Sequence, residues 1–94
     1  MKAFADPLNT AVITTKYVVS QQSPILTVFH FADGFWQFSG PEKQVAEADY
    51  LVLGLAEVIA LDPSIVEVAG LPLGVGASRV NKEAAWTFEK LVDA

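Results

Sequence analysis

The stretch ILTVFHFADGFWQFS, residues 25–39, decides the fold expected of this 94-residue chain. Residues 25–31 and 35–39 are rich in β-branched and aromatic side chains, which is typical of strands. Asp33-Gly34 lies between them and supplies the positive φ angles that a tight hairpin turn needs. The stretch therefore predicts a central β-hairpin.

The register of this hairpin depends on the length of its turn. A two-residue turn at Asp33-Gly34 pairs His30 with Gln37 and puts four aromatic side chains on one buried face. The four are Phe29, Phe31, Trp36 and Phe38. A three-residue loop that begins at Ala32 instead sets His30 opposite Trp36 and separates the four. Because a slip of one residue turns every side chain to the other face, grouping of the aromatics favours the two-residue turn.

Shorter elements flank the hairpin. The β-branched run 11–15 predicts a first strand, and Tyr17-Val18-Val19 either continues it or forms a helical turn capped by Thr15. Residues 42–49 are polar and form a loop or a weak helical turn. Residues 50–53 predict a further, buried strand.

Apolar spacing predicts a short amphipathic helix over residues 55–61. Asp62-Pro63 ends it and starts a second helix that runs to about Ala69. A loop that leads into a strand covers 71–80. The segment 82–92 is a helix by propensity, or extended through Trp86.

The fold class that follows is α+β, in one domain of residues 1–94. It consists of a small, mainly antiparallel sheet with a central hairpin and two short helices packed on one face.

Composition limits the class of protein. Hydrophobic residues make up 52% of the chain, so a small domain leaves apolar surface exposed, and we expect a homodimer. The chain has no cysteine, which excludes disulfides and thiolate chemistry. No run approaches the roughly 18 apolar residues of a membrane helix. Asp6-Pro7 interrupts the start before an apolar signal region forms, so no membrane association and a cytoplasmic location are expected.

The net charge of −5 is concentrated in residues 42–70, whereas 1–41 and 71–94 are each neutral. Two interpretations follow, an ordinary solvated face or a docking surface for a basic protein partner. In the second, Glu57 and Glu67 project from neighbouring helices and form one patch. With a single arginine and no basic cluster, nucleic acid is not an expected partner.

No pattern indicates catalysis or a cofactor. His30 is the one histidine, and with Asp33 it offers two metal ligands at most. Residues 74–79 begin like a dinucleotide fingerprint, but Arg79 stands where the third glycine belongs. We therefore expect a protein that is not an enzyme and has no metal and no cofactor.

Two functions remain for the candidate binding residues. The first is the binding and occlusion of a partner protein. The second is a small-molecule or enzymatic pocket near His30, Gln37 and Arg79. The full candidate set is His30, Asp33, Trp36, Gln37, Glu57, Glu67, Arg79 and Trp86.

Three segments together resemble a group of small bacterial proteins of unknown function that is similar to the immunity protein 33 family. They are 11–15, the stretch from Pro24 to Phe38, and Asp62-Pro63-Ser64-Ile65 with Leu71-Pro72-Leu73-Gly74 and Arg79. The resemblance spans about Asp6 to Trp86, with Phe31 where the group has an acidic residue. It implies an α+β fold, no catalytic residues, a role in binding and neutralising a toxin, and an extended course near Trp86.

Overall fold

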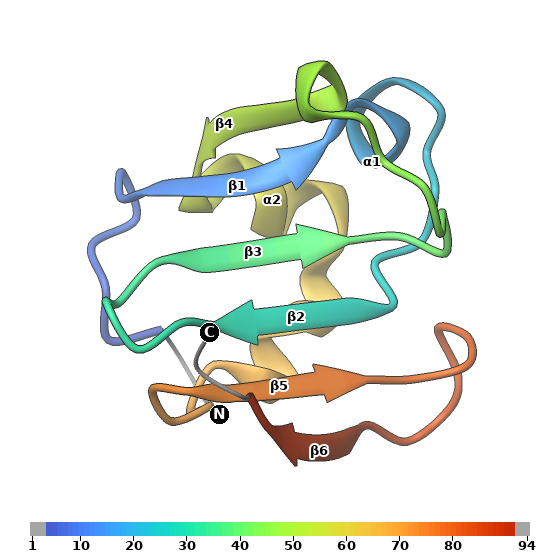
Figure 1. Ribbon diagram of the computed structural model, residues 1–94. Helices are drawn as coiled ribbons and strands as arrows, with labels where there is room; N and C mark the ends of the chain where they lie inside the picture. The colour runs from blue at the N-terminus through green and yellow to red at the C-terminus, as the bar shows by residue number, and fades with distance from the viewer. Residues whose placement is uncertain (1–3, 92–94) are drawn as a thin grey trace.

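A six-stranded sheet in the order β4-β1-β3-β2-β5-β6 forms the centre of the computed structural model, which describes residues 4–91 (Figure 1). The strands are β1 (Ala11–Thr15), β2 (Thr27–His30), β3 (Trp36–Ser39), β4 (Tyr50–Gly54), β5 (Val75–Ser78) and β6 (Thr87–Lys90). The fold is thus α+β, as expected, but its sheet is larger than the sequence suggested.

The sheet is mixed. Four of its neighbouring pairs are antiparallel, and β1 runs parallel to β3 with Ile13 opposite Gln37. A parallel pair needs a crossover connection, and the segment with α1 (Lys16–Ser20) and β2 provides it. The first strand therefore lies inside the sheet, between β3 and β4.

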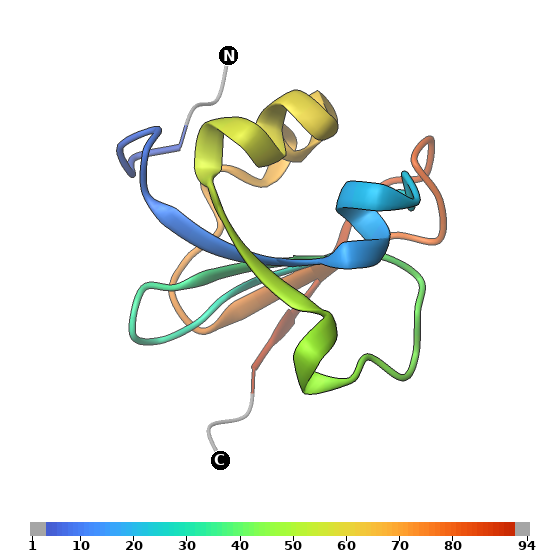
Figure 2. The ribbon, with the colours of Figure 1, turned by 90° about the horizontal axis from the view of Figure 1, so that it is seen from above.

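The helices lie over one face of the sheet, as Figure 2 shows for α1, α2 (Leu55–Leu61) and the 3₁₀ helix η2 (Pro63–Val68). The short 3₁₀ helix η1 (Glu47–Asp49) lies on the opposite side. The predicted caps are confirmed: the Thr15 Oγ1 accepts from the Val18 N–H, and the Asp62 Oδ1 accepts from the Ser64 N–H.

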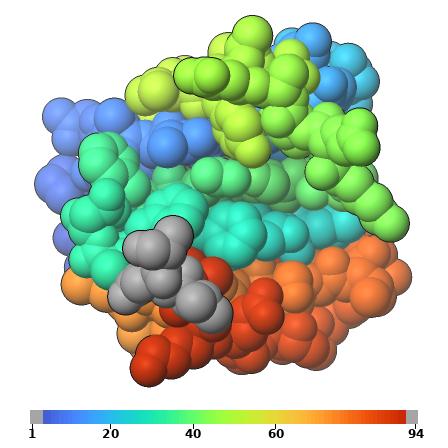
Figure 3. All heavy atoms as spheres, in the orientation of Figure 1, coloured from blue at the N-terminus to red at the C-terminus, as the bar shows by residue number. Residues whose placement is uncertain are grey.

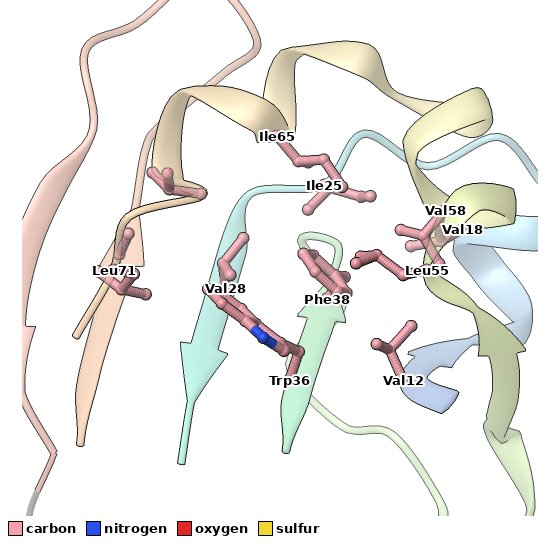
Figure 4. Packing of buried hydrophobic residues seen from close by; sticks show 12 residues of the cluster. Val12, Val18, Ile25, Val28, Trp36, Phe38, Leu55, Val58, Ile65 and Leu71 are labelled. Atoms are coloured by element: carbon pink, nitrogen blue, oxygen red, sulfur yellow. The ribbon is translucent and has the colours of Figure 1, made fainter. Parts of the chain in front are cut away.

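The core fills the space between the sheet and these helices (Figure 4). Trp36 and Phe38 of β3 are its largest buried side chains. Leu55 and Val58 of α2 and Ile65 of η2 cover them from the helix side. Burying such side chains stabilises the fold by roughly 1.5–3 kcal/mol each.

The register predicted for the central hairpin is wrong. His30 lies opposite Trp36 and Phe29 opposite Gln37. The loop has three residues, because the Phe31 N–H donates to the Phe35 carbonyl, and Gly34 takes a φ of 98° at the end of the turn. The four aromatics are therefore divided: Trp36 and Phe38 enter the core, and Phe29 and Phe31 stack on the other face with ring centroids 5.7 Å apart.

The structure decides one open alternative and corrects one further expectation. Of the two alternatives for 82–92, the described residues 82–91 do not form the helix, because β6 pairs with β5 from Val75↔Lys90 to Ser78↔Thr87, and this pairing outweighs the helix propensity of residues 82–85. The strand at 50–53 exists, but it lies at an edge of the sheet, and Val52 is 68% exposed.

None of the helices within residues 4–91 is long and apolar enough to cross a bilayer. In the same range, no three His, Asp or Glu side chains are placed to hold a metal ion.

Candidate functional site

The candidate site is the face of the sheet that carries no long helix. Buried Val12, Val28, Trp36, Phe38 and Ala77 point to the helix side. Because side chains alternate along a strand, the residues between them point to the other face. They include apolar Ile13 of β1, Phe29 of β2, and Tyr50 and Val52 of β4, which pair with Thr15 and Ile13. They also include polar Thr27, Gln37, Ser39, Ser78 and Thr87. We call this surface the helix-free face, and Figure 3 shows it.

A shallow groove of about 280 Å³ crosses this face at the β4 side. Its lining is mostly apolar and consists of Ile13, Gln37, Tyr50, Leu51 and Val52. Tyr50 and Val52 are 39% and 68% exposed. An exposed apolar surface of this kind is characteristic of a binding site.

One end of the helix-free face is held by a polar cluster that anchors η1. The Asp49 carboxylate accepts from Lys16 Nζ at 3.0 Å, from the Tyr17 hydroxyl at 3.0 Å and from the Ala46 N–H. The hydrogen bond from Lys16 holds the pKa of Asp49 below its usual value, and the same bond raises the pKa of Lys16. These contacts hold η1 against the end of β1 and α1.

His30 lies on the helix side of the sheet, away from this face. Its ring stacks on Trp36 with centroids 3.8 Å apart. Its Nδ1 lies 2.7 Å from the Leu71 carbonyl, and since a carbonyl only accepts, Nδ1 carries the proton. Trp36 in turn donates from Nε1 to the Asp6 carboxylate. These contacts give both residues packing roles.

Arg79 is buried and holds several chain segments together. Its guanidinium donates twice to the Ile25 carbonyl, once to the Lys82 carbonyl and once to the Ser64 hydroxyl. It also forms an ion pair with Asp62 at 3.2 Å, and the two side chains are 1% and 6% exposed. With its side chain only 1% exposed, the guanidinium is not accessible to a ligand from solvent.

Trp86 and Glu67 extend the Arg79 cluster to the surface. The Arg79 guanidinium lies 4.1 Å from the centre of the Trp86 ring, and Trp86 Nε1 donates to Glu67 at 3.0 Å. The structure therefore brings together three of the candidate residues, Arg79, Trp86 and Glu67. Their contacts are to one another, and they hold the segment that leads into β6.

The expected acidic patch of Glu57 and Glu67 does not form as one surface. Glu57 accepts from the Gly54 N–H at the end of β4, and Glu67 contacts Trp86 beside β6. β4 and β6 are the two opposite edges of the sheet. The two carboxylates are therefore separated, because α2 and η2 cover different ends of the same face.

The pocket expected near His30, Gln37 and Arg79 is not assembled either. His30 pairs with Val75 at one end of the β2–β5 ladder, whereas the Arg79 N–H bonds Leu26 beyond the other end. Gln37 points to the opposite face of the sheet from His30. Asp33 lies in the hairpin loop, where its carboxylate accepts from the Phe35 N–H.

A second cleft, of about 320 Å³, opens beside the end of α2. The Asp62 carboxylate lies at this cleft and is buried, and it already accepts hydrogen bonds from the Ser64 hydroxyl and the Arg79 guanidinium. The cleft is lined by Val18, Gln22, Ser23, Pro24, Ile25, Ala60, Leu61, Asp62 and Lys82.

Sequence reasoning missed Ile13, Phe29, Tyr50 and Val52 as surface residues. A β-branched or aromatic residue in a strand looks the same whether its face is covered or open. In β4 exposed and less exposed side chains alternate, but no polar/apolar alternation in the sequence marks this, because its first four residues are all apolar.

Comparisons of the chain with family models, with curated proteins and with solved structures find no match.

Proposed function

We propose that this chain is a non-enzymatic protein-interaction domain that binds a partner protein on the helix-free face. One observation carries the proposal: Ile13, Phe29, Tyr50 and Val52 place apolar side chains on a sheet face that the helices leave open. An antiparallel sheet with one covered face usually presents polar side chains on the other. Apolar and aromatic side chains are the groups from which interaction sites draw most of their binding energy.

Charge around this face favours a basic partner. Glu47 and Asp49 lie in η1 at one end, and Glu89 of β6 points to the same face because it pairs with Gly76. Of these carboxylates, Asp49 pairs with Lys16, so Glu47 and Glu89 carry the uncompensated charge at this face. Such a surface speeds association with a basic protein, and added salt reduces the effect.

The action that fits this geometry is occlusion. A shallow apolar groove on an open sheet face can cover a surface of a partner and does not enclose a small substrate. Neutralisation of a toxin, as the sequence resemblance implies, would be an action of this type.

A photo-crosslinking experiment tests the proposal. A benzophenone amino acid is placed at Val52 on the helix-free face, or at Leu61 on α2, which is 43% exposed, and each protein is irradiated in a lysate of its native host. We expect a specific protein adduct from position 52 and none from position 61. A partner captured only from position 61 would refute the assignment of the face.

Affinity for the recovered partner then provides the matched comparison. Val52→Ser should weaken binding by roughly tenfold, since burial of one aliphatic side chain is worth about 1.5–3 kcal/mol. Leu61→Ser should leave the affinity unchanged. Equal effects of the two substitutions would contradict the proposal.

A further inference from the structure

The two edges of the sheet differ in how many backbone groups they leave open. At the β4 edge, the Leu55 N–H donates to the Thr10 carbonyl of the neighbouring chain segment. Residues of an antiparallel strand alternate between facing the paired strand and facing away from it, so Tyr50, Val52 and Gly54 direct their N–H and C=O groups away from β1. The Tyr50 N–H donates to the Glu47 carbonyl, and the Gly54 N–H donates to Glu57. Of the outward groups at this edge, the Val52 N–H and the Tyr50 and Val52 carbonyls remain open in the described part of the chain, so two of its three outward N–H groups are already satisfied.

The β6 edge is open along its length. The Leu91 N–H bonds the Gly74 carbonyl, so by the same alternation Glu89 and Thr87 face β5, and Phe88 and Lys90 direct their N–H and C=O groups outward. No hydrogen bond within residues 4–91 engages these outward groups. Every residue of β6 is exposed, and Phe88 is 62% exposed.

We propose that the β6 edge is a homodimer interface, in which β6 of a second copy pairs antiparallel with β6 and continues the sheet across both protomers. Strand addition satisfies the outward backbone groups in both copies at once. A two-fold axis at Phe88 makes the contact closed and self-complementary.

The side chains of β6 select this register. With the axis at Phe88, the two Phe88 rings lie side by side and Thr87 of each copy faces Glu89 of the other. With the axis at Glu89, two glutamates face each other directly, which is unfavourable. In each protomer Phe88 also lines a groove of about 290 Å³, together with Glu67, Val68, Gly70, Leu71, Pro72 and Val75.

The distribution of charge favours a second copy at this edge. β6 carries one Glu89 and one Lys90, so two paired strands have no net charge to repel each other, whereas Glu47 and Asp49 directly precede β4 at the opposite edge. Pairing through β6 keeps η1 and β4 of the two protomers apart. It also leaves Val52 and its groove free, so the dimer would present two helix-free faces.

Sedimentation velocity at increasing concentration tests the proposal with substitutions matched between the two edges. Wild-type protein should be a dimer at micromolar concentration. Phe88→Asp, at an exposed β6 position, should be a monomer, and Val52→Asp, at an exposed β4 position, should remain a dimer. Lys90→Pro removes an outward N–H without breaking the bond pattern to β5 and should also be a monomer, whereas Lys90→Ala should dimerise.

Hydrogen exchange of the wild-type protein decides the question without any substitution. The Phe88 and Lys90 amides should be protected in a concentration-dependent manner, because only a second copy covers them. Any one of three results would overturn the proposal. They are a wild-type monomer at high micromolar concentration, fast exchange of both amides at every concentration, and loss of the dimer in Val52→Asp alone. Loss of partner binding in Val52→Ser with an intact dimer would separate this result from the proposed function.

Discussion

Arg79→Met should destabilise the domain more than any exposed substitution, because Arg79 is the buried centre of a polar cluster. Methionine approximates the apolar stem but removes every donor of the guanidinium. The substitution leaves the Asp62 carboxylate, only 6% exposed, without its cation and leaves the Ile25 carbonyl without two donors. Removal of one partner from a buried pair costs about 3–5 kcal/mol.

That loss is large for a domain of this size. Whole domains are stable by roughly 5–15 kcal/mol, and each kcal/mol lowers Tm by about 4–8 °C in a domain of 60–100 residues. We therefore expect Tm to fall by at least about 12 °C. Urea unfolding, followed by the fluorescence of Trp36 and Trp86, measures the difference in free energy, with exposed Lys43→Met as the control.

A second substitution separates the buried charge from the lost packing. Asp62→Asn keeps the carbonyl oxygen that accepts from the Ser64 N–H but removes the charge. Arg79→Met with Asp62→Asn should therefore be more stable than Arg79→Met alone, since no uncompensated charge remains. A loss below about 1 kcal/mol for Arg79→Met, or full additivity of the two changes, would refute this reasoning.

Three further predictions concern the turn, the η1 anchor and the core. Gly34→Ala should cost roughly 1–2 kcal/mol in urea unfolding because of its φ of 98°, whereas Gly70→Ala, which has open space and no positive φ, should cost less. The hydrogen bond from Lys16 lowers the pKa of Asp49, so the stabilisation from the Asp49 carboxylate should be complete above about pH 4 and disappear as the pH falls through its native pKa. The urea midpoints of the wild-type protein and Asp49→Asn should therefore converge in acid. Thr14→Val should cost about 1–3 kcal/mol, because the buried hydroxyl donates to a backbone carbonyl at 2.9 Å, and equal midpoints for this variant and wild type would contradict that value.

Local signals predicted the elements whose boundaries depend on local chemistry. The helix at Leu55–Leu61 begins after a glycine and ends at Asp62-Pro63, and the structure places it there. Thr15 and Asp62 act as caps because their side-chain oxygens reach N–H groups two or three residues on. These signals need no information from the rest of the chain.

The hairpin register and the last strand depend on distant parts of the chain. Both faces of the hairpin carry aromatic residues, so hydrophobic pattern alone does not select between a two-residue and a three-residue loop. The segment after Arg79 is extended because it pairs with β5 and because Trp86 packs on the Arg79 guanidinium. The candidate site was missed for the same reason, since which sheet face the helices cover depends on the whole topology.

The position of β1 inside the sheet has a consequence for the order in which the chain is synthesised. β1 leaves the ribosome before the other strands of this sheet, yet its neighbours are β3 and β4, so one of its edges stays unpaired until Gly54 has emerged. During that interval a nascent chain exposes an apolar strand that can pair with other chains. Once residues 11–54 are complete, four adjacent strands are present, and β5 and β6 can add to the edge of β2. Slow decoding between Ser39 and Tyr50 would therefore prolong the period in which the newly made protein is most prone to aggregate.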